Sequence, residues 1–201
     1  MMHLDPFLFT DEAVSHETRE FNAWLRDELL AMPKTSDQEP EDIRAARFEG
    51  RGPFGPVVYS EHARTITITG PGGDLDLRVI ETTDRVDGVY VTIHRGGWVL
   101  GGADLSDPGN EAMARAANVA TVSIQYRLAP EHPFPAGLED CVAATRWIIE
   151  NATAEFGTDR LTIGGESAGA NLVAAVLQST RDDLSYRAWH GVNLVYGVYA
   201  P

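Results

Sequence analysis

The first part of the chain carries a mainly apolar stripe with the spacing of a surface helix. Its members recur every three or four positions: Val14, Thr18, Phe21, Leu25 and Leu29. Pro33 ends the pattern, and the acidic stretch 35–42 is predicted to be a mobile connection. Because the stripe has little core of its own, we expect residues 1–45 to form helices that cap another domain.

From about residue 64 the pattern changes to that of a sheet. Residues 65–69 alternate polar and apolar side chains, and a Pro-Gly-Gly turn leads into a second strand at 75–80. The further predicted strands are 89–93, 119–124, 161–164 and 192–196, and the helices between them are 111–117, 136–151 and 168–180. Strands separated by single helices form right-handed crossovers. Residues 46–201 are therefore predicted to form an α/β core, with a mostly parallel sheet that has an antiparallel start.

Composition and charge narrow the class of protein. Of the 201 residues, 43% are hydrophobic and 23% are charged, which is ordinary for a soluble globular protein. The net charge of -14 argues against nucleic acid or an anionic membrane surface as a partner. No stretch approaches the roughly 20 apolar residues that cross a bilayer. With one cysteine, Cys141, and no signal-like N-terminus, the sequence favours a cytoplasmic protein.

The segment Gly165-Glu166-Ser167-Ala168-Gly169 falls between a predicted strand and a predicted helix. Glycines at both ends permit a very tight turn, in which a Cβ atom would crowd the strand and the helix. Such a turn raises the serine hydroxyl above the sheet edge, at the N-terminus of the helix. The positive end of the helix dipole there favours the negative charge that develops during acyl transfer. The alternative is an ordinary turn with a capping serine. The flanking strand and helix favour Ser167 as a nucleophile.

A second segment, His94-Arg95-Gly96-Gly97-Trp98, follows directly after another predicted strand. Two adjacent glycines bring bare N–H groups close to a substrate carbonyl, as an oxyanion hole requires, although paired glycines also occur in flexible loops. This segment and the serine segment both follow parallel strands. They therefore share the carboxyl edge of the sheet, where α/β folds bind ligands.

Three segments resemble those of the hormone-sensitive-lipase-type carboxylesterases, in the same order and with the same spacing. They are 93–98 (Ile-His-Arg-Gly-Gly-Trp), 126–136 (Tyr-Arg-Leu-Ala-Pro-Glu-His-Pro-Phe-Pro-Ala) and 164–172 (Gly-Gly-Glu-Ser-Ala-Gly-Ala-Asn-Leu). The resemblance runs from about residue 60 onward and implies an α/β-hydrolase fold with an N-terminal cap. It further implies an oxyanion hole of Gly96, Gly97 and Ala168, acylation of Ser167, and a loop-shaping role for His94. We expect no cofactor and no metal.

Two residues depart from the pattern of that family. Arg95 stands where the family usually has glycine, so it either pairs with an acid and stiffens the loop or narrows the pocket. Gln125 stands where the family often has an acid, which predicts the loss of a structural hydrogen bond or ion pair. Neither change removes a group that the chemistry needs.

The acid and the base of a catalytic triad are harder to place. This fold uses the order serine, acid, histidine, and after Ser167 the sequence offers Asp182, Asp183 and His190. His190 precedes the last predicted strand, so it enters at the amino edge, nearly 20 Å from Ser167. The aspartates lie at the far end of the helix that begins beside Ser167. We therefore expect the acid, the base and the C-terminal strands in a further segment or a second chain.

The leading interpretation is a serine carboxylesterase that hydrolyses short acyl esters through an acyl-enzyme on Ser167. Amide or carbamate hydrolysis would use the same groups. One alternative is a non-catalytic small-molecule-binding protein of the same fold. The other is an inactive fragment with an exposed sheet edge.

Overall fold

The computed structural model describes residues 5–53 and 55–199, and it divides into two compact units at Val57 and Val58. The sequence placed this boundary at residues 45 and 46, whereas residues 46–57 group with the N-terminal unit. The reason is a second helix, Pro40–Phe48, which crosses the predicted boundary. Its proline and acidic residues occupy the first helical turn, where both are favourable, so part of the predicted connection is the start of a helix.

The N-terminal unit consists of helices. Its elements are η1 (Pro6–Phe9), η2 (Asp11–Ala13), α1 (His16–Ala31), η3 (Thr35–Asp37) and α2 (Pro40–Phe48). Helix α1 begins at a Ser15 cap, whose hydroxyl oxygen accepts from the Thr18 N–H at 3.1 Å. Most apolar side chains of α1 are exposed, with Phe21 at 54% and Leu30 at 78%, and no residue of this helix is fully buried. The unit therefore has no core comparable to that of the second unit.

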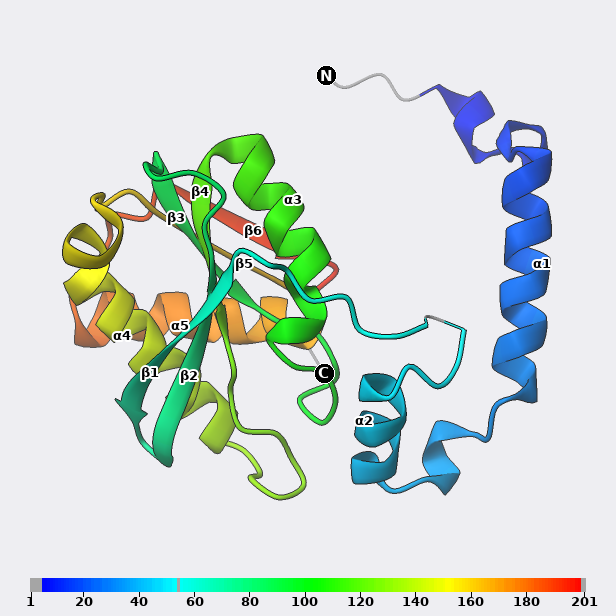
Figure 1. Ribbon diagram of the computed structural model, residues 1–201, viewed down its shortest axis with the longest axis horizontal. Coiled ribbons are helices and arrows are strands. Elements are labelled where there is room, and N and C mark those ends of the chain that lie inside the picture. Colours follow the sequence, from blue (N-terminus) through cyan, green and yellow to red (C-terminus); the bar gives the residue numbers. More distant parts are fainter. Residues whose placement is uncertain (1–4, 54, 200–201) are drawn as a thin grey trace. The chain divides into compact units, whose positions relative to one another are not determined.

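The second unit is built on one six-stranded sheet (Figure 1). Its strands are β1 (Ala63–Gly70), β2 (Gly73–Ile80), β3 (Gly88–Ile93), β4 (Val119–Ile124), β5 (Leu161–Glu166) and β6 (Gly191–Val195). They are arranged in the order β1-β2-β4-β3-β5-β6. The β1–β2 and β2–β4 pairs are antiparallel, and the other three pairs are parallel. The predicted mostly parallel sheet with an antiparallel start is confirmed.

Helices cover both faces of this sheet. They are η4 (Asp104–Ser106), α3 (Asp107–Ala117), α4 (Ala136–Phe156) and α5 (Ala168–Asp183). Figure 1 shows α3 on one side and α4 with α5 on the other, as right-handed crossovers require. The buried side chains between the layers come mainly from β2, β3, β4 and β5 and from the inner faces of α4 and α5. No helix in the described residues is long and apolar enough to span a membrane.

A buried ion pair fixes the start of this unit. Asp107, which is fully buried, accepts from the Arg78 guanidinium at 2.6 Å and from the Ser60 N–H at 2.9 Å. Removing one partner of such a pair leaves an uncompensated buried charge. This carboxylate therefore ties the first residues of the unit to strand β2 and helix α3.

The sheet is well covered at β3 and β4 but not at β6. Of the apolar residues in β6, Val192 is 46% exposed and Leu194 is 41% exposed. Strand β6 pairs with β5 along one edge, and it is the last strand in the order of the sheet. It is therefore an exposed, partly apolar edge strand of the kind that readily pairs with another segment.

Candidate active site

Ser167 lies in a sharp turn between β5 and α5, with φ 52° and ψ -118°. A non-glycine residue rarely adopts such a positive φ, and strain of this kind is found where a side chain has to be presented precisely. The turn is held by the Ser167 N–H, which donates to the Val195 carbonyl at 2.9 Å. The Asn171 N–H donates to the Ser167 carbonyl at 3.2 Å, which starts helix α5.

The glycines around Ser167 are required by close packing. A Cβ atom added at Gly165 would lie 2.6 Å from the carbonyl carbon of Gly169. A Cβ atom added at Gly169 would collide with the carbonyl oxygen of Ile93, at the end of β3. The first turn of α5 therefore packs directly against the strand that leads into the His94–Trp98 loop. This contact brings the two segments identified from the sequence together.

The loop after β3 exposes backbone donors. Gly96 has φ 130° and Gly97 has φ 61°, and the Gly96 carbonyl accepts from the Leu100 N–H at 2.8 Å, which closes the loop on itself. Among the described residues, the N–H groups of Gly96 and Gly97 donate no hydrogen bond. Ala168 begins α5, where first-turn N–H groups have no acceptor in their own helix. The two segments thus contribute three amide N–H groups that have no acceptor among the described residues.

The His94 side chain is buried and bonds the backbone of this loop. Its ring stacks on Tyr126, with centroids 4.2 Å apart, and its Nδ1 lies 2.8 Å from the Arg95 carbonyl oxygen. The Tyr126 hydroxyl donates to the His94 carbonyl at 3.1 Å. Burial lowers the pKa of His94 to about 4. A neutral ring that bonds the loop backbone is suited to holding the loop in shape.

We expect His94 to make the protein less stable in mild acid. The unfolded-state pKa of histidine is about 6.5, above the folded-state pKa of about 4, so the unfolded chain binds more protons between these values. The contribution of neutral His94 to the free energy of unfolding is complete above about pH 6.5. As the pH falls toward 4, the free energy of unfolding decreases by on the order of 1–3 kcal/mol. Urea denaturation at pH 7 and pH 5 should show that His94→Gln removes part of this dependence. An unaltered dependence in His94→Gln would contradict the assignment.

The structure shows the partners of Arg95 and Gln125, the two residues that depart from the family pattern. Arg95 Nη1 lies 2.7 Å from Glu166 Oε2, so this arginine pairs with an acid. Gln125 Oε1 accepts from the Ala103 N–H at 2.7 Å. Gln125 therefore keeps a structural hydrogen bond to the backbone, since an amide oxygen can accept from an N–H as a carboxylate oxygen can, and the predicted loss of an ion pair at this position stays a prediction.

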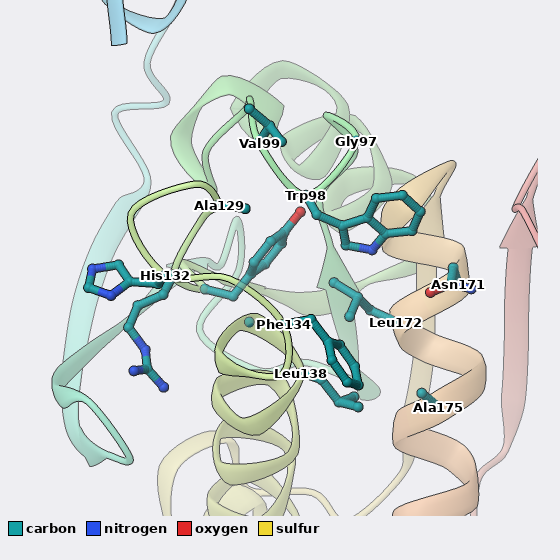
Figure 2. Close-up of a pocket in the computed structure, with 13 residues that line it drawn as sticks. Gly97, Trp98, Val99, Ala129, His132, Phe134, Leu138, Asn171, Leu172 and Ala175 are labelled. Carbon is teal, nitrogen blue, oxygen red and sulfur yellow. The ribbon is translucent and has the colours of Figure 1, made fainter. Parts of the chain in front are cut away.

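An apolar pocket of about 450 Å³ opens next to the loop and the first turns of α5 (Figure 2). In Figure 2 the side chains of Trp98, Phe134, Leu138 and Leu172 point toward one another, whereas His132 points away from this cluster. Gly97 lies at the rim, where a Cβ atom would meet no described atom within 4 Å. An apolar group bound here would lie beside the free amides of the loop.

The remaining candidates for an acid and a base lie away from Ser167. The His190 N–H donates to the Leu161 carbonyl at 2.8 Å, at the start of β5, whereas Ser167 follows the end of that strand. Six residues at about 3.3 Å each separate the two by nearly 20 Å. Asp182 and Asp183 end α5, a helix of 16 residues that begins at Ala168, which places them about 20 Å or more away. The described residues also contain no cluster of His, Cys, Asp or Glu that could hold a metal ion.

Comparison with known proteins agrees with this arrangement. Residues 90–201 match the model of a protein family whose description is α/β hydrolase fold. The chain belongs to the α/β-hydrolase family. The strand-turn-helix around Ser167 and the loop at Gly96 and Gly97 both fall within the part of this α/β hydrolase that matches.

The relatives of this α/β hydrolase include bacterial and archaeal esterases. Carboxylesterase NlhH of Mycobacterium tuberculosis is 52% identical over 96 residues, which are 47% of this chain and 30% of the relative. Carboxylic ester hydrolase LipN of the same organism is 40% identical over 153 residues, 73% of this chain and 40% of the relative. An esterase structure from Pyrobaculum calidifontis gives a TM-score of 0.74 at 27% identity, covering 94% of this chain and 61% of that one. The chain thus spans less than two thirds of their lengths.

Sequence reasoning missed several residues around the site of this α/β hydrolase. Glu166 and Tyr196 were not singled out, although Glu166 Oε2 accepts from both Arg95 and the Tyr196 hydroxyl. The opposite charges of Arg95 and Glu166 are visible in the sequence, but the register that brings them together, with Ile93 opposite Gly165, appears only in the structure. Phe134 of the pocket gave no such signal, because a loop side chain has no periodicity to read.

Proposed function

We propose that this chain supplies the nucleophile and the oxyanion hole of a serine carboxylesterase that acts on short acyl esters. The observation that carries the proposal is the strained Ser167 turn packed against a loop whose Gly96 and Gly97 N–H groups are free. Stabilisation of the oxyanion by such preorganised donors is usually the largest single contribution to the rate of acyl transfer. The carboxylesterase NlhH and the ester hydrolase LipN support the choice of an ester substrate.

The reaction would proceed through a covalent intermediate. The Ser167 oxygen attacks the ester carbonyl carbon while a base takes the hydroxyl proton, and the N–H groups of Gly96, Gly97 and Ala168 stabilise the oxyanion. The proton then passes to the alcohol, which leaves. Water, activated by the same base, attacks the acyl-enzyme and releases the acid. We propose that the base and its acid partner belong to a C-terminal segment or a second chain, because neither His94 nor His190 is placed to serve.

The surroundings of Ser167 suggest how an ester is held. We propose that the pocket lined by Trp98, Phe134, Leu138 and Leu172 takes the apolar part of the ester, with its carbonyl at the rim beside Gly97. The helices of the N-terminal unit, whose apolar side chains are exposed, are proposed to act as a cap. A buried free cysteine suits the cytoplasm, which we propose as the location.

Gly97→Ala is expected to lower kcat by about 10²-fold or more, the usual effect of losing one oxyanion donor. The left-handed backbone at φ 61° disfavours alanine, and the shift that relieves it moves the adjacent N–H groups. Gly157→Ala is the matched control, because Gly157 has φ 72° and open space around it, but lies at the end of α4. Thermal melting should show equal changes in Tm for the two variants. Steady-state kinetics should show the lower kcat only for Gly97→Ala. Equal kcat values would contradict the oxyanion assignment.

A steady-state assay tests the proposed activity itself. The enzyme that contains this chain should hydrolyse p-nitrophenyl acetate and butyrate, with a kcat/KM that falls for long acyl chains. Absence of ester hydrolysis, with retained binding of apolar esters, would favour the non-catalytic binding protein instead.

A further inference from the structure

One carboxylate oxygen connects the three loops that follow β3, β5 and β6. Glu166 Oε2 accepts from Arg95 Nη1 at 2.7 Å and from the Tyr196 hydroxyl at 2.8 Å. Arg95 belongs to the loop that carries Gly96 and Gly97, and Glu166 directly precedes Ser167. Tyr196 directly follows β6. All three side chains therefore meet at the carboxyl edge of the sheet, beside the site.

The loop after β6 has other attachments to the serine turn. The Val195 carbonyl accepts from the Ser167 N–H at 2.9 Å, and the Val198 carbonyl accepts from Asn171 Nδ2 at 2.7 Å. Between residues 94–98 and residues 165–169, by contrast, the described residues form one side-chain hydrogen bond, from Arg95 to Glu166. This bond links the two segments whose N–H groups would face one oxyanion.

The exposure of this pair indicates what the bond can do. The side chains of Arg95 and Glu166 are 68% and 45% exposed, and exposed ion pairs contribute little to the stability of a fold. Neither residue lines the apolar pocket that we propose for the ester; both line a separate pocket of about 230 Å³. A contact that adds little to folding can still restrict how the loop lies against the serine turn. Misplacing donors by a fraction of an ångström lowers the rate of acyl transfer.

We propose that Arg95 and Glu166 are positioning residues, which hold the Gly96 and Gly97 N–H groups at the distance from Ser167 that acyl transfer requires. The inference rests on the proposed esterase function. Tyr196 bonds the same oxygen of Glu166 and so keeps the carboxylate turned toward Arg95. The effect should appear in kcat, since the loop geometry matters most when charge develops on the carbonyl oxygen.

The test uses Arg95→Met, Glu166→Met and the double variant in the esterase that contains this chain, because methionine at either position offers no partner for the bond. Each single variant should lower kcat for p-nitrophenyl acetate about two- to fivefold, as expected for an exposed pair, with KM and Tm unchanged. The double variant should lose no more than one single variant, because both break the same bond. Arg95→Lys, which keeps the charge, should recover most of the activity.

Two controls separate this role from others. Arg181→Met removes a comparably exposed ion pair with Asp182 at the far end of α5 and should leave kcat unchanged. In about 1 M salt, where the Debye length is about 3 Å, the wild-type kcat should fall toward that of Arg95→Met. Wild-type kcat in both single variants, or fully additive losses, would overturn the positioning role while leaving the esterase function intact. A wild-type enzyme without Ser167-dependent turnover would overturn both.

Discussion

Replacing Ser167 with alanine is expected to lower the kcat of the esterase by about 10⁶-fold, as removal of the nucleophile does in well-studied serine hydrolases. The alternative, direct attack by water, would use only the oxyanion donors and substrate binding, which leave a small residual rate. Because the strained turn is imposed by Gly165 and Gly169 rather than by the hydroxyl, alanine should adopt it at little cost in folding. The structure predicts a variant with a normal Tm and almost no activity.

Steady-state kinetics together with thermal melting would check this expectation. Ser179→Ala is the matched control, because Ser179 lies on the same helix and its hydroxyl donates to Asp183 at 2.6 Å, far from the turn. That variant should keep full activity. Turnover by Ser167→Ala within tenfold of the wild type would show that another residue forms the acyl-enzyme, or that none does.

The second large effect concerns residues 1–201 expressed alone. We expect them to hydrolyse p-nitrophenyl acetate no faster than the same residues carrying Ser167→Ala. If the base lies outside these residues, as we propose, the Ser167 hydroxyl stays protonated and is a poor nucleophile at neutral pH, and loss of the base costs about 10⁶-fold in kcat. The exposed Val192 and Leu194 of β6 should also make this protein associate in solution.

Assays of 1–201 with and without the segment that supplies the base, combined with light scattering, would measure both effects. Adding that segment as a separate chain should restore turnover and reduce association. Ser167-dependent turnover by residues 1–201 alone would show that they contain a base. The exclusion of His190, which rests on its place at the start of β5 and β6, would then be wrong.

Much of the core could be predicted because its residues follow simple periods. The strand 65–69 alternates, the strands at 89–93 and 119–124 are rich in β-branched residues, and the structure has β1, β3 and β4 at these places. The serine turn was recognisable because chemistry and geometry both constrain it. Glycine at 165 and 169 is explained by backbone atoms that leave no room for a Cβ atom.

The errors came where a residue type has two meanings. Pro40 with Glu41 and Asp42 was interpreted as an acidic connection, but proline and acids also suit the first turn of a helix, and α2 begins there. Whether Arg95 pairs or narrows the pocket depended on the register of β3 with β5, which no single segment contains. The registration of Ile93 with Gly165 decides it, because it places Glu166 within reach of the guanidinium.

The central claim is that Ser167 forms the covalent intermediate. Its most direct test is to treat the esterase that contains this chain with a fluorophosphonate, digest it and map the adduct by mass spectrometry. The account predicts one adduct per active chain, on the peptide that contains Ser167, and loss of labelling in Ser167→Ala. An adduct on any other residue, or full labelling of Ser167→Ala, would contradict it.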